Sequence, residues 1–449
     1  MTAPSQLLDW ITAQPWSNGR VGVYGQSFVA LTAYAAIASR HPAVEAAFVS
    51  ATPLDPYASV GYPGGLYARG FGENYIALTD DLDAVATPVD DDQDGAQLHA
   101  AIAERKTLTF SGLVADLFQT TPARDGRSER EAQSWSDISL EPVMDAVAAS
   151  ETPVYAIGGW LDIFSDDTVR LNSLSKGQNK LVMRPWHHRL LFAREHDLDP
   201  ATEARAWFDR WLKDAAPRPE SEPGAFYFQQ AGDVGTRQEG TWCKATGWPE
   251  TATPETSIRF APSLGGKLQK IGAPSFGPAE TITVPADPEA TSGVNSRWNG
   301  VLGNGRYEDL AVLNPQAIRF TSEPFAEKAS ISGAPVLHVT VDSSAASAVH
   351  AFLEYVGPDT KAAYLSEGVS RLVAGAPAVV DIRLLPTAVE VARGGRLRLT
   401  VLASDRDNFA PETPTGPSPL TLHLGGGDPP TLLLPSQPCL PVHFGAISR

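Results

Sequence analysis

The chain has 449 residues, of which 43% are hydrophobic, and its formal net charge is −17 at pH 7. A chain of this length and apolar content is expected to form roughly two to three domains with sizeable cores. The acidic balance argues against nucleic acid and anionic membrane as partners, because both repel a negatively charged surface.

The first predicted elements are a helix over residues 6–13, a turn at Asn18-Gly19 and a short buried strand over residues 21–24. The strand is followed by Gly25-Gln26-Ser27-Phe28-Val29-Ala30, and residues 31–38 are rich in alanine and favour a helix. A serine on a tight turn between a strand and a helix is typical of a nucleophile elbow, which holds the hydroxyl out of the sheet. An ordinary Gly-Ser turn is the alternative interpretation.

Residues 59–148 are predicted to form a helical cap, after another strand over residues 44–50. Helices are expected within the cap over residues 95–106 and 128–135. The cap also holds seven aspartates with no basic residue between them: Asp80, Asp81, Asp83, Asp90, Asp91, Asp92 and Asp94. A calcium-binding loop is conceivable, but the spacing does not match the EF-hand pattern, so a solvated acidic loop is the simpler interpretation.

Two later strands each end beside a residue that suits the chemistry of Ser27. Residues 153–157 are predicted as a buried strand with Asp162 just beyond it, and residues 180–183 as the next strand, with His187 and His188 beyond it. Singly, Asp162 could cap a helix, and either histidine could be a hydrogen-bonded loop residue. The order serine, aspartate, histidine, each in the loop after a strand, is that of α/β-hydrolases and therefore indicates a Ser-His-Asp triad.

The C-terminal half is predicted to be all-β. An α/β core over residues 1–58 and 149–216 is expected to close with an aromatic helix around residues 207–212, and a linker rich in proline and glutamate follows at 217–223. Residues 224–449 contain short strands and turns, including alternating runs at 336–341 and 396–401, which suit strands with one buried face. This pattern indicates a β-sandwich.

Cys243 and Cys439 are the only cysteines, and no metal-ligand spacing links them to a histidine. They could pair with each other, whereas a cysteine nucleophile or a structural zinc is not expected. The N-terminus lacks the basic start and apolar core of a signal peptide, and no stretch approaches the ~18 apolar residues of a membrane span. A cytoplasmic protein is therefore expected.

Four motifs together resemble one family of hydrolases. They are residues 18–22 with 25–28, Gly159-Trp160-Leu161-Asp162, Pro185-Trp186-His187-His188 and residues 207–213. They look like the cocaine esterase and X-Pro dipeptidyl-peptidase group, which also includes α-amino acid ester hydrolases and glutaryl acylase-like enzymes. The likeness runs from about residue 7 to the C-terminus. It implies an α/β-hydrolase domain with a helical cap insertion and a C-terminal jelly-roll β-sandwich.

The resemblance also implies roles for individual residues. Ser27 would be the nucleophile, Asp162 the orienting acid and His188 the base, and the Phe28 backbone N–H would be an oxyanion donor. Where the family pattern is Gly-Pro-Trp-Ser/Thr-His, this chain has Arg184-Pro185-Trp186-His187-His188, so the match favours His188 over His187.

One departure from the family pattern lies before Ser27. Family members carry earlier strands of the sheet there, and a tyrosine whose hydroxyl completes the oxyanion hole. The hydrolase domain is therefore expected to be N-terminally incomplete, with the strand at 21–24 leaving an unpaired edge. We expect poor solubility, pairing with an upstream polypeptide or a homo-oligomer.

The expected activity is serine hydrolysis of a small-molecule ester, an amide or a short peptide through an acyl-enzyme, with no cofactor and no metal. Tyr57, Trp160 and Phe164 lie in segments able to line an apolar acyl pocket, although each could equally be a core residue. Two alternatives stay open. The chain could be a non-catalytic binding protein or an inactive remnant, or it could transfer the acyl group to an amine or alcohol instead of water.

Overall fold

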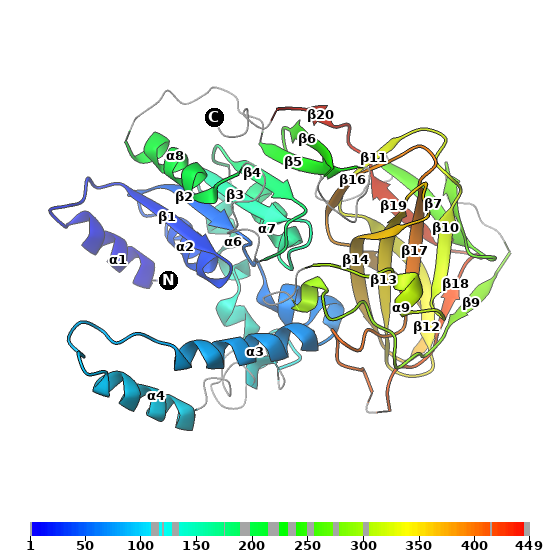
Figure 1. The fold of residues 1–449 in the computed structure, drawn as a ribbon, viewed down its shortest axis with the longest axis horizontal. Helices are drawn as coiled ribbons and strands as arrows, with labels where there is room; N and C mark the ends of the chain where they lie inside the picture. The colour runs from blue at the N-terminus through cyan, green and yellow to red at the C-terminus, as the bar shows by residue number, and fades with distance from the viewer. Residues whose placement is uncertain are drawn as a thin grey trace.

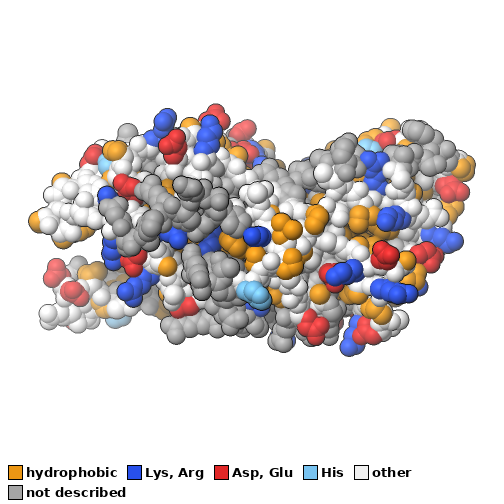
Figure 2. All heavy atoms as spheres, turned by 90° about the horizontal axis from the view of Figure 1, so that it is seen from above, with side chains coloured by type: hydrophobic (Ala, Val, Ile, Leu, Met, Phe, Trp, Pro, Cys, Tyr) orange, Lys and Arg blue, Asp and Glu red, His pale blue; other side chains and the backbone are white. Residues whose placement is uncertain are grey.

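An α/β half and a β-rich half lie side by side in the protein (Figure 1). The computed structural model describes residues 2–108, 116–118, 121–127, 134–174, 176–188, 198–213, 224–231, 239–248, 256–272, 278–299, 305–413 and 415–443. On the face shown in Figure 2, acidic and basic side chains are interspersed over the β-rich half. None of the helices in the described ranges is long and apolar enough to cross a membrane.

A parallel sheet forms the centre of the α/β half. Its first five strands run in the order β1 (Val21–Gln26), β2 (Val44–Ser50), β3 (Val154–Gly159), β4 (Lys180–Arg184) and β5 (Ala225–Gln230), each parallel to the next. β1 is the end strand of this order. All six residues of β3 are buried, which fits a strand covered by structure on both faces.

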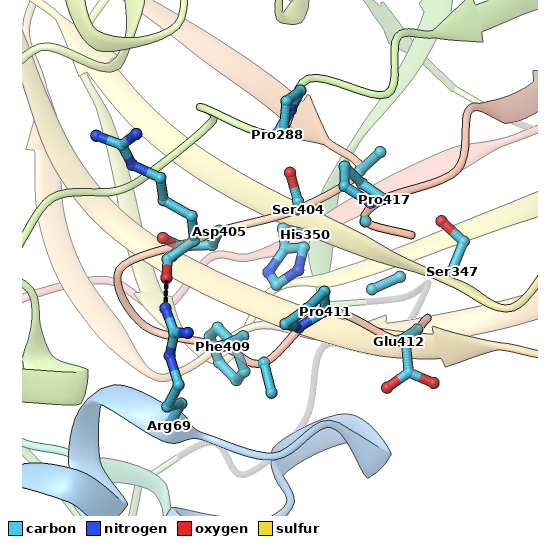
Figure 3. A pocket seen from close by; sticks show the side chains of 15 residues that line it. Arg69, Pro288, Ser347, His350, Ser404, Asp405, Phe409, Pro411, Glu412 and Pro417 are labelled. Carbon is cyan, nitrogen blue, oxygen red and sulfur yellow. Dashed lines mark hydrogen bonds between the residues drawn. The ribbon is translucent and has the colours of Figure 1, made fainter. Parts of the chain in front are cut away.

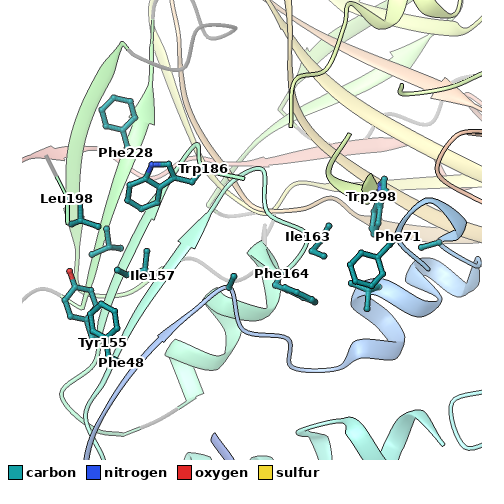
Figure 4. Packing of buried hydrophobic residues seen from close by; sticks show 14 of the residues in the cluster. Phe48, Phe71, Tyr155, Ile157, Ile163, Phe164, Trp186, Leu198, Phe228 and Trp298 are labelled. Atoms are coloured by element: carbon teal, nitrogen blue, oxygen red, sulfur yellow. The ribbon is translucent and has the colours of Figure 1, made fainter. Parts of the chain in front are cut away.

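Helices cover both faces of the sheet. Alternate side chains of a strand point to opposite sides, so apolar residues on both faces have to be buried. Ala46 and Phe48 of β2 belong to a cluster that contains aromatic residues of α8 (Pro200–Leu212). Ala47 and Val49 belong to a second cluster, with residues of α2 (Phe28–Ala38) and α7 (Ser165–Leu174). Figure 4 shows the first cluster, in which Phe48 and Tyr155 lie together on the sheet. The elements that complete the second face are α1 (Thr2–Thr12) and α6 (Met144–Ala148).

The segment between β2 and β3 is largely helical. It contains η1 (Tyr57–Gly61), η2 (Pro63–Gly65), α3 (Arg69–Ala84), α4 (Ala96–Leu108), η3 (Trp135–Ile138) and η4 (Glu141–Val143). α3 and α4 run along the lower side of the molecule in Figure 1. In the acidic run, Asp92 is buried, and its carboxylate accepts hydrogen bonds from the Gln97 and Leu98 amides in the first turn of α4.

The first sheet continues beyond β5 into the C-terminal half. β5 pairs with β6 (Gly240–Ala245) and with β16 (Thr387–Val391), which pairs in turn with β11 (Ala329–Gly333). β20 (Leu440–Pro441) pairs with β6, and the nearby Cys439 forms a disulfide with Cys243. The linker predicted at 217–223 lies outside the described residues, and the division of the chain there stays a prediction. β4 and β5, on either side of it in the sequence, pair in the same sheet.

Eleven described strands form a second sheet with its own apolar core. They are β7 (Ser257–Ser263), β8 (Lys267–Ile271), β9 (Thr281–Val284), β10 (Ile318–Ser322), β12 (Val336–Ser343), β13 (Ser347–Val356), β14 (Ala362–Leu372), β15 (Gly375–Arg383), β17 (Arg396–Leu402), β18 (Leu420–His423) and β19 (Thr431–Pro435). β12 alternates between buried and half-buried residues over its whole length, as a strand with one buried face does. The short elements η6 (Arg297–Asn299) and α9 (Leu310–Leu313) lie in this half.

The strands predicted at 21–24, 44–50, 153–157, 180–183, 336–341 and 396–401 are confirmed. The helices predicted at 6–13 and 31–38 correspond to α1 and α2, and the predicted helix at 95–106 corresponds to α4. The helix predicted at 128–135 falls mostly on residues 128–133, outside the described ranges, and Trp135 begins the 3-10 turn η3. The α/β plus all-β fold class is confirmed.

Candidate active site

Ser27 lies on a sharp turn between β1 and α2. Its backbone has φ 55° and ψ −133°, a combination that non-glycine residues rarely adopt and that a nucleophile elbow requires. The Ser27 amide donates to the Ser50 carbonyl oxygen at 3.0 Å, which fixes the turn to the end of β2. A Cβ atom added to Gly25 would lie 2.7 Å from the Val29 carbonyl oxygen and 2.8 Å from the Ala30 backbone. The tight turn therefore needs glycine at position 25.

His188 connects Ser27 to Asp162. The His188 Nε2 atom lies 3.1 Å from Ser27 Oγ, and its Nδ1 atom lies 2.8 Å from Asp162 Oδ2. Ser27 follows β1, Asp162 follows β3 and His188 follows β4. The three residues therefore meet at the carboxyl ends of parallel strands, where α/β folds place their sites. The structure thus brings Ser27, Asp162 and His188 together, with His188 and not His187 as the bridging ring.

The loops that carry Asp162 and His188 are joined at the backbone. The Leu161 amide donates to the Trp186 carbonyl at 3.0 Å, and the Trp160 amide donates to the Arg184 carbonyl at 2.7 Å. A Cβ atom at Gly159 would lie 2.1 Å from the Trp186 carbonyl oxygen, so glycine permits this approach. The other oxygen of Asp162, Oδ1, accepts from the Phe164 amide at 2.6 Å. These contacts restrict the direction in which Asp162 can point.

The surroundings of His188 raise its affinity for a proton, as a general base requires. Burial lowers the pKa of His188, but the charge of the Asp162 carboxylate and its hydrogen bond raise it, and the net pKa is above the usual value for a histidine. Only the Nε2 atom that faces Ser27 remains to accept a proton, because Nδ1 is engaged by Asp162. A raised pKa increases the driving force for taking the serine proton.

Phe28, the predicted oxyanion donor, is the first residue of α2. Backbone N–H groups in the first turn of a helix lack intrahelical partners, and the helix dipole adds positive potential there. The Phe28 side chain is 53% exposed, so the ring does not close this end of the helix.

The three predicted pocket residues occupy different surroundings. The Phe164 ring is buried, with its centroid 5.7 Å from that of His188. Tyr57 is half-buried, stacks on Tyr62 and donates its hydroxyl hydrogen to the Pro122 carbonyl. Trp160 is fully buried against Trp248, and its indole N–H donates to the Phe228 carbonyl. Trp160 therefore takes the core role that the sequence left open, because its ring packs into the sheet.

A residue that sequence reasoning missed contacts the Asp162 loop from the β-rich half. Arg297, in η6, donates to the carbonyl oxygens of both Trp160 and Asp162. No motif marks this arginine, and 135 residues separate it from Asp162. Only the packing of the two halves brings them together.

A separate cavity of about 190 Å³ lies between α3 and the β-rich half (Figure 3). Arg69 of α3 points into it and donates to the Arg406 carbonyl, and His350 of β13 lines it beside Phe409. Burial lowers the pKa of His350 to about 3, so this ring is neutral. The lining includes no member of the Ser27, Asp162 and His188 group.

The comparisons with known proteins agree with this architecture. A sequence model described as X-Pro dipeptidyl-peptidase (S15 family) matches residues 1–189, and one described as the X-Pro dipeptidyl-peptidase C-terminal non-catalytic domain matches residues 218–432. The cocaine esterase of Rhodococcus sp. is 25% identical over 465 residues, which span 91% of this chain and 77% of the relative. A Mycobacterium bovis protein that carries the name serine esterase is also 25% identical, over 90% of this chain and 74% of its own length.

Solved structures share the fold. A CocE/NonD family hydrolase from Staphylococcus aureus superposes with a TM-score of 0.70 at 15% identity, over 96% of this chain and 75% of that one. An α-amino acid ester hydrolase also reaches a TM-score of 0.70, at 18% identity, over 97% of this chain and 80% of that one. With its two matching sequence models and its esterase relatives, the chain belongs to the cocaine esterase and X-Pro dipeptidyl-peptidase family of serine hydrolases.

Proposed function

We propose that this serine hydrolase cleaves an ester or amide through an acyl-enzyme, with Ser27 as nucleophile, His188 as base and Asp162 as the group that orients His188. The observation that carries the proposal is the unbroken pair of contacts from Ser27 Oγ through the His188 ring to Asp162. The strained backbone of Ser27 adds support, because strain of this kind concentrates at functional sites.

The chemistry takes place in two steps. His188 Nε2 accepts the hydroxyl proton as Ser27 Oγ bonds to the substrate carbonyl carbon, and the carbonyl oxygen becomes an oxyanion. The tetrahedral intermediate expels the alcohol or amine, which leaves with the proton held by His188. Water then adds to the ester formed on Ser27, and His188 again accepts and returns one proton, so that the acid and free Ser27 result.

The Phe28 N–H is the proposed oxyanion donor within this chain. It lies next to Ser27 at the start of α2, where its hydrogen can face the developing negative charge. The substrate class is a small ester, an amide or a short peptide. The acyl group would lie near Phe164, the aromatic side chain that contacts His188, with Tyr57 as a second candidate wall.

We also propose that a further polypeptide strand pairs with the free edge of β1. β1 ends the sheet order in the described part of the chain, and Tyr24 of β1 is more than half exposed. An unpaired apolar edge favours association. Such a strand, from another polypeptide or a second copy of this chain, would also approach the elbow closely enough to supply a second oxyanion donor.

A fluorophosphonate probe tests the catalytic proposal, because it reacts covalently with an activated serine. Labelling is expected in the unmodified protein and should disappear in Ser27→Ala and fall steeply in His188→Ala. Ser173→Ala is a matched control, since Ser173 lies on α7 and its hydroxyl donates to the Val169 carbonyl. Labelling that persists in Ser27→Ala would exclude Ser27 as the nucleophile.

Sedimentation velocity tests the proposal for the edge strand. The protein is expected to associate, and Tyr24→Lys should reduce the association, because a charge on an edge strand opposes pairing. A monomer that unfolds cooperatively and hydrolyses esters on its own would contradict this proposal while leaving the catalytic one intact.

A further inference from the structure

Arg297 is a fully buried arginine that joins the β-rich half to the loop carrying Asp162. Its Nη1 atom donates to the Asp162 carbonyl oxygen at 3.1 Å and lies 3.3 Å from Ser165 Oγ. Its Nη2 atom donates to the Trp160 carbonyl oxygen at 2.9 Å. One planar guanidinium thus holds two carbonyl groups, on either side of Leu161. The fixed fork of the guanidinium sets the separation and direction of both carbonyls.

The guanidinium is itself held by three residues of the β-rich half. Its Nε atom lies 3.0 Å from Glu367 Oε1, and Nη2 donates to the Tyr364 hydroxyl at 2.6 Å. The hydroxyls of Tyr307 and Tyr364 donate to the same Glu367 oxygen, at 2.7 and 3.1 Å, and the two rings stack with centroids 3.6 Å apart. Glu367 supplies the counter-charge that a buried arginine needs. Contacts within the β-rich half therefore fix the position of the Arg297 guanidinium, independently of its contacts with the Asp162 loop.

Leu161 anchors the same loop by packing. Its side chain is 5% exposed and lies in an apolar cluster with Phe352, Tyr364 and Leu402 of the β-rich half. Trp160, Leu161 and Asp162 are therefore each fixed by contacts outside their own loop. The backbone of Asp162 determines where its carboxylate begins, and that carboxylate approaches His188 Nδ1 at 2.8 Å.

We propose that Arg297 is a positioning residue for the hydrolase, which holds Asp162 in the orientation that keeps His188 aligned with Ser27. This inference rests on the proposed function of Ser27, His188 and Asp162. It assigns to the β-rich half a direct part in the geometry of the active site, although Arg297 itself touches no reacting atom. The two carbonyl groups that Arg297 holds belong to Trp160 and Asp162, so the fork acts directly on the backbone that carries the Asp162 carboxylate.

The test replaces the buried pair without leaving a lone charge. The variant combines Arg297→Met with Glu367→Gln, which removes both charges and the donors to the loop carbonyls. A matched control combines Arg398→Met with Glu354→Gln. Arg398 is also paired with a buried glutamate of the β-rich half, with its Nη2 atom 2.6 Å from Glu354 Oε1, and its contacts with Glu354 and Asp309 stay within that half.

The readouts are the rate of fluorophosphonate labelling at Ser27 from pH 5 to pH 9 and the thermal unfolding midpoint. Arg297→Met with Glu367→Gln should slow labelling on the order of tenfold to 100-fold, because small misplacements of catalytic groups have effects of that size. It should also move the acid limb of the labelling profile to lower pH, because a displaced Asp162 no longer raises the pKa of His188. The control should lower the unfolding midpoint without moving the acid limb.

Three outcomes separate the claims. An unmoved acid limb and an unchanged labelling rate in the Arg297 variant would overturn the positioning role, while labelling of the unmodified protein still supports the proposed function. Equal shifts of the acid limb in both double variants would mean that the shift comes from a general loosening of the β-rich half. That result would also overturn the positioning role of Arg297. If the Arg297 double variant does not fold, Arg297→Lys replaces it. That variant keeps the charge and loses the fork, and the same downward shift of the limb is required.

Discussion

At the scale of single residues, three side chains from three loops converge because parallel strands end at the same edge of a sheet. The sequence motifs were enough to predict Ser27, Asp162 and His188 as candidates, since each motif has a fixed position after its strand. The sequence could not assign Trp160 to the core, because the same strand end can direct a ring toward either face. Arg297 could not be predicted either, because its contact with Asp162 depends on the packing of two distant segments.

Replacing Asp162 by asparagine tests the electrostatic part of the account. Burial lowers the pKa of His188 and the Asp162 carboxylate raises it, so without that charge the pKa should fall. Because His188 must be neutral to accept a proton, activity is lost as the pH falls through this pKa. In Asp162→Asn the acid limb of kcat/KM should therefore move to lower pH.

The rate should fall as well. A drop in kcat/KM of about 10,000-fold is expected, as for the loss of the aspartate in other serine triads. A steady-state pH profile with a chromogenic ester measures both effects. An acid limb that stays in place would mean that Asp162 does not govern the protonation of His188.

At the scale of elements, the tight turn of the elbow requires small residues at particular positions of the sequence. Gly25 and Ala30 are small because the first turn of α2 passes directly over the end of β1. The strand, the turn and the helix could be predicted from local composition. The segment between β2 and β3 was harder to predict. Short turns such as η1 and η2 have no periodicity that can be recognised in a sequence.

Gly25→Ala should disrupt the elbow. The new methyl group would meet the Val29 carbonyl oxygen at 2.7 Å and the Ala30 backbone at 2.8 Å, and backbone atoms cannot move aside cheaply. The free energy of unfolding should fall by about 1–3 kcal/mol, the usual cost of overpacking, and activity should fall with it. Urea unfolding measures the change.

Gly247→Ala is the matched control for this substitution. A Cβ atom at Gly247 meets nothing within 4 Å, and the residue is exposed. Its unfolding curve should match that of the unmodified protein. If Gly25→Ala is equally silent, the elbow is looser than the described geometry.

At the scale of the whole molecule, the two halves share structure. Strands from the β-rich half extend the first sheet through β16 and β11, and Arg297 reaches the Asp162 loop. The division into an α/β and an all-β part was predictable, because the sequence pattern changes to short alternating strands after the run rich in proline and glutamate at 217–223. The continuity of the sheet was not, because pairing between distant strands leaves no local signal.

The disulfide provides a test at this scale. Cys243 and Cys439 are 196 residues apart and join β6 to the segment beside β20. Closing so long a loop restricts the unfolded chain, so Cys243→Ser with Cys439→Ser should lower the free energy of unfolding by about 2–5 kcal/mol. Denaturant unfolding with and without a reductant checks this: the reductant should affect only the unmodified protein. Equal stability of the two proteins would mean that the bond does not contribute to the fold.

The most direct test of the central claim is to observe the acyl group on Ser27. The protein is mixed with an activated acetate ester, quenched in acid within the first turnover, digested and examined by mass spectrometry. We expect one acetyl group on the peptide that contains Ser27, and none on that peptide in Ser27→Ala. Ester hydrolysis with no acyl group on Ser27, or with the acyl group on another residue, would contradict the account.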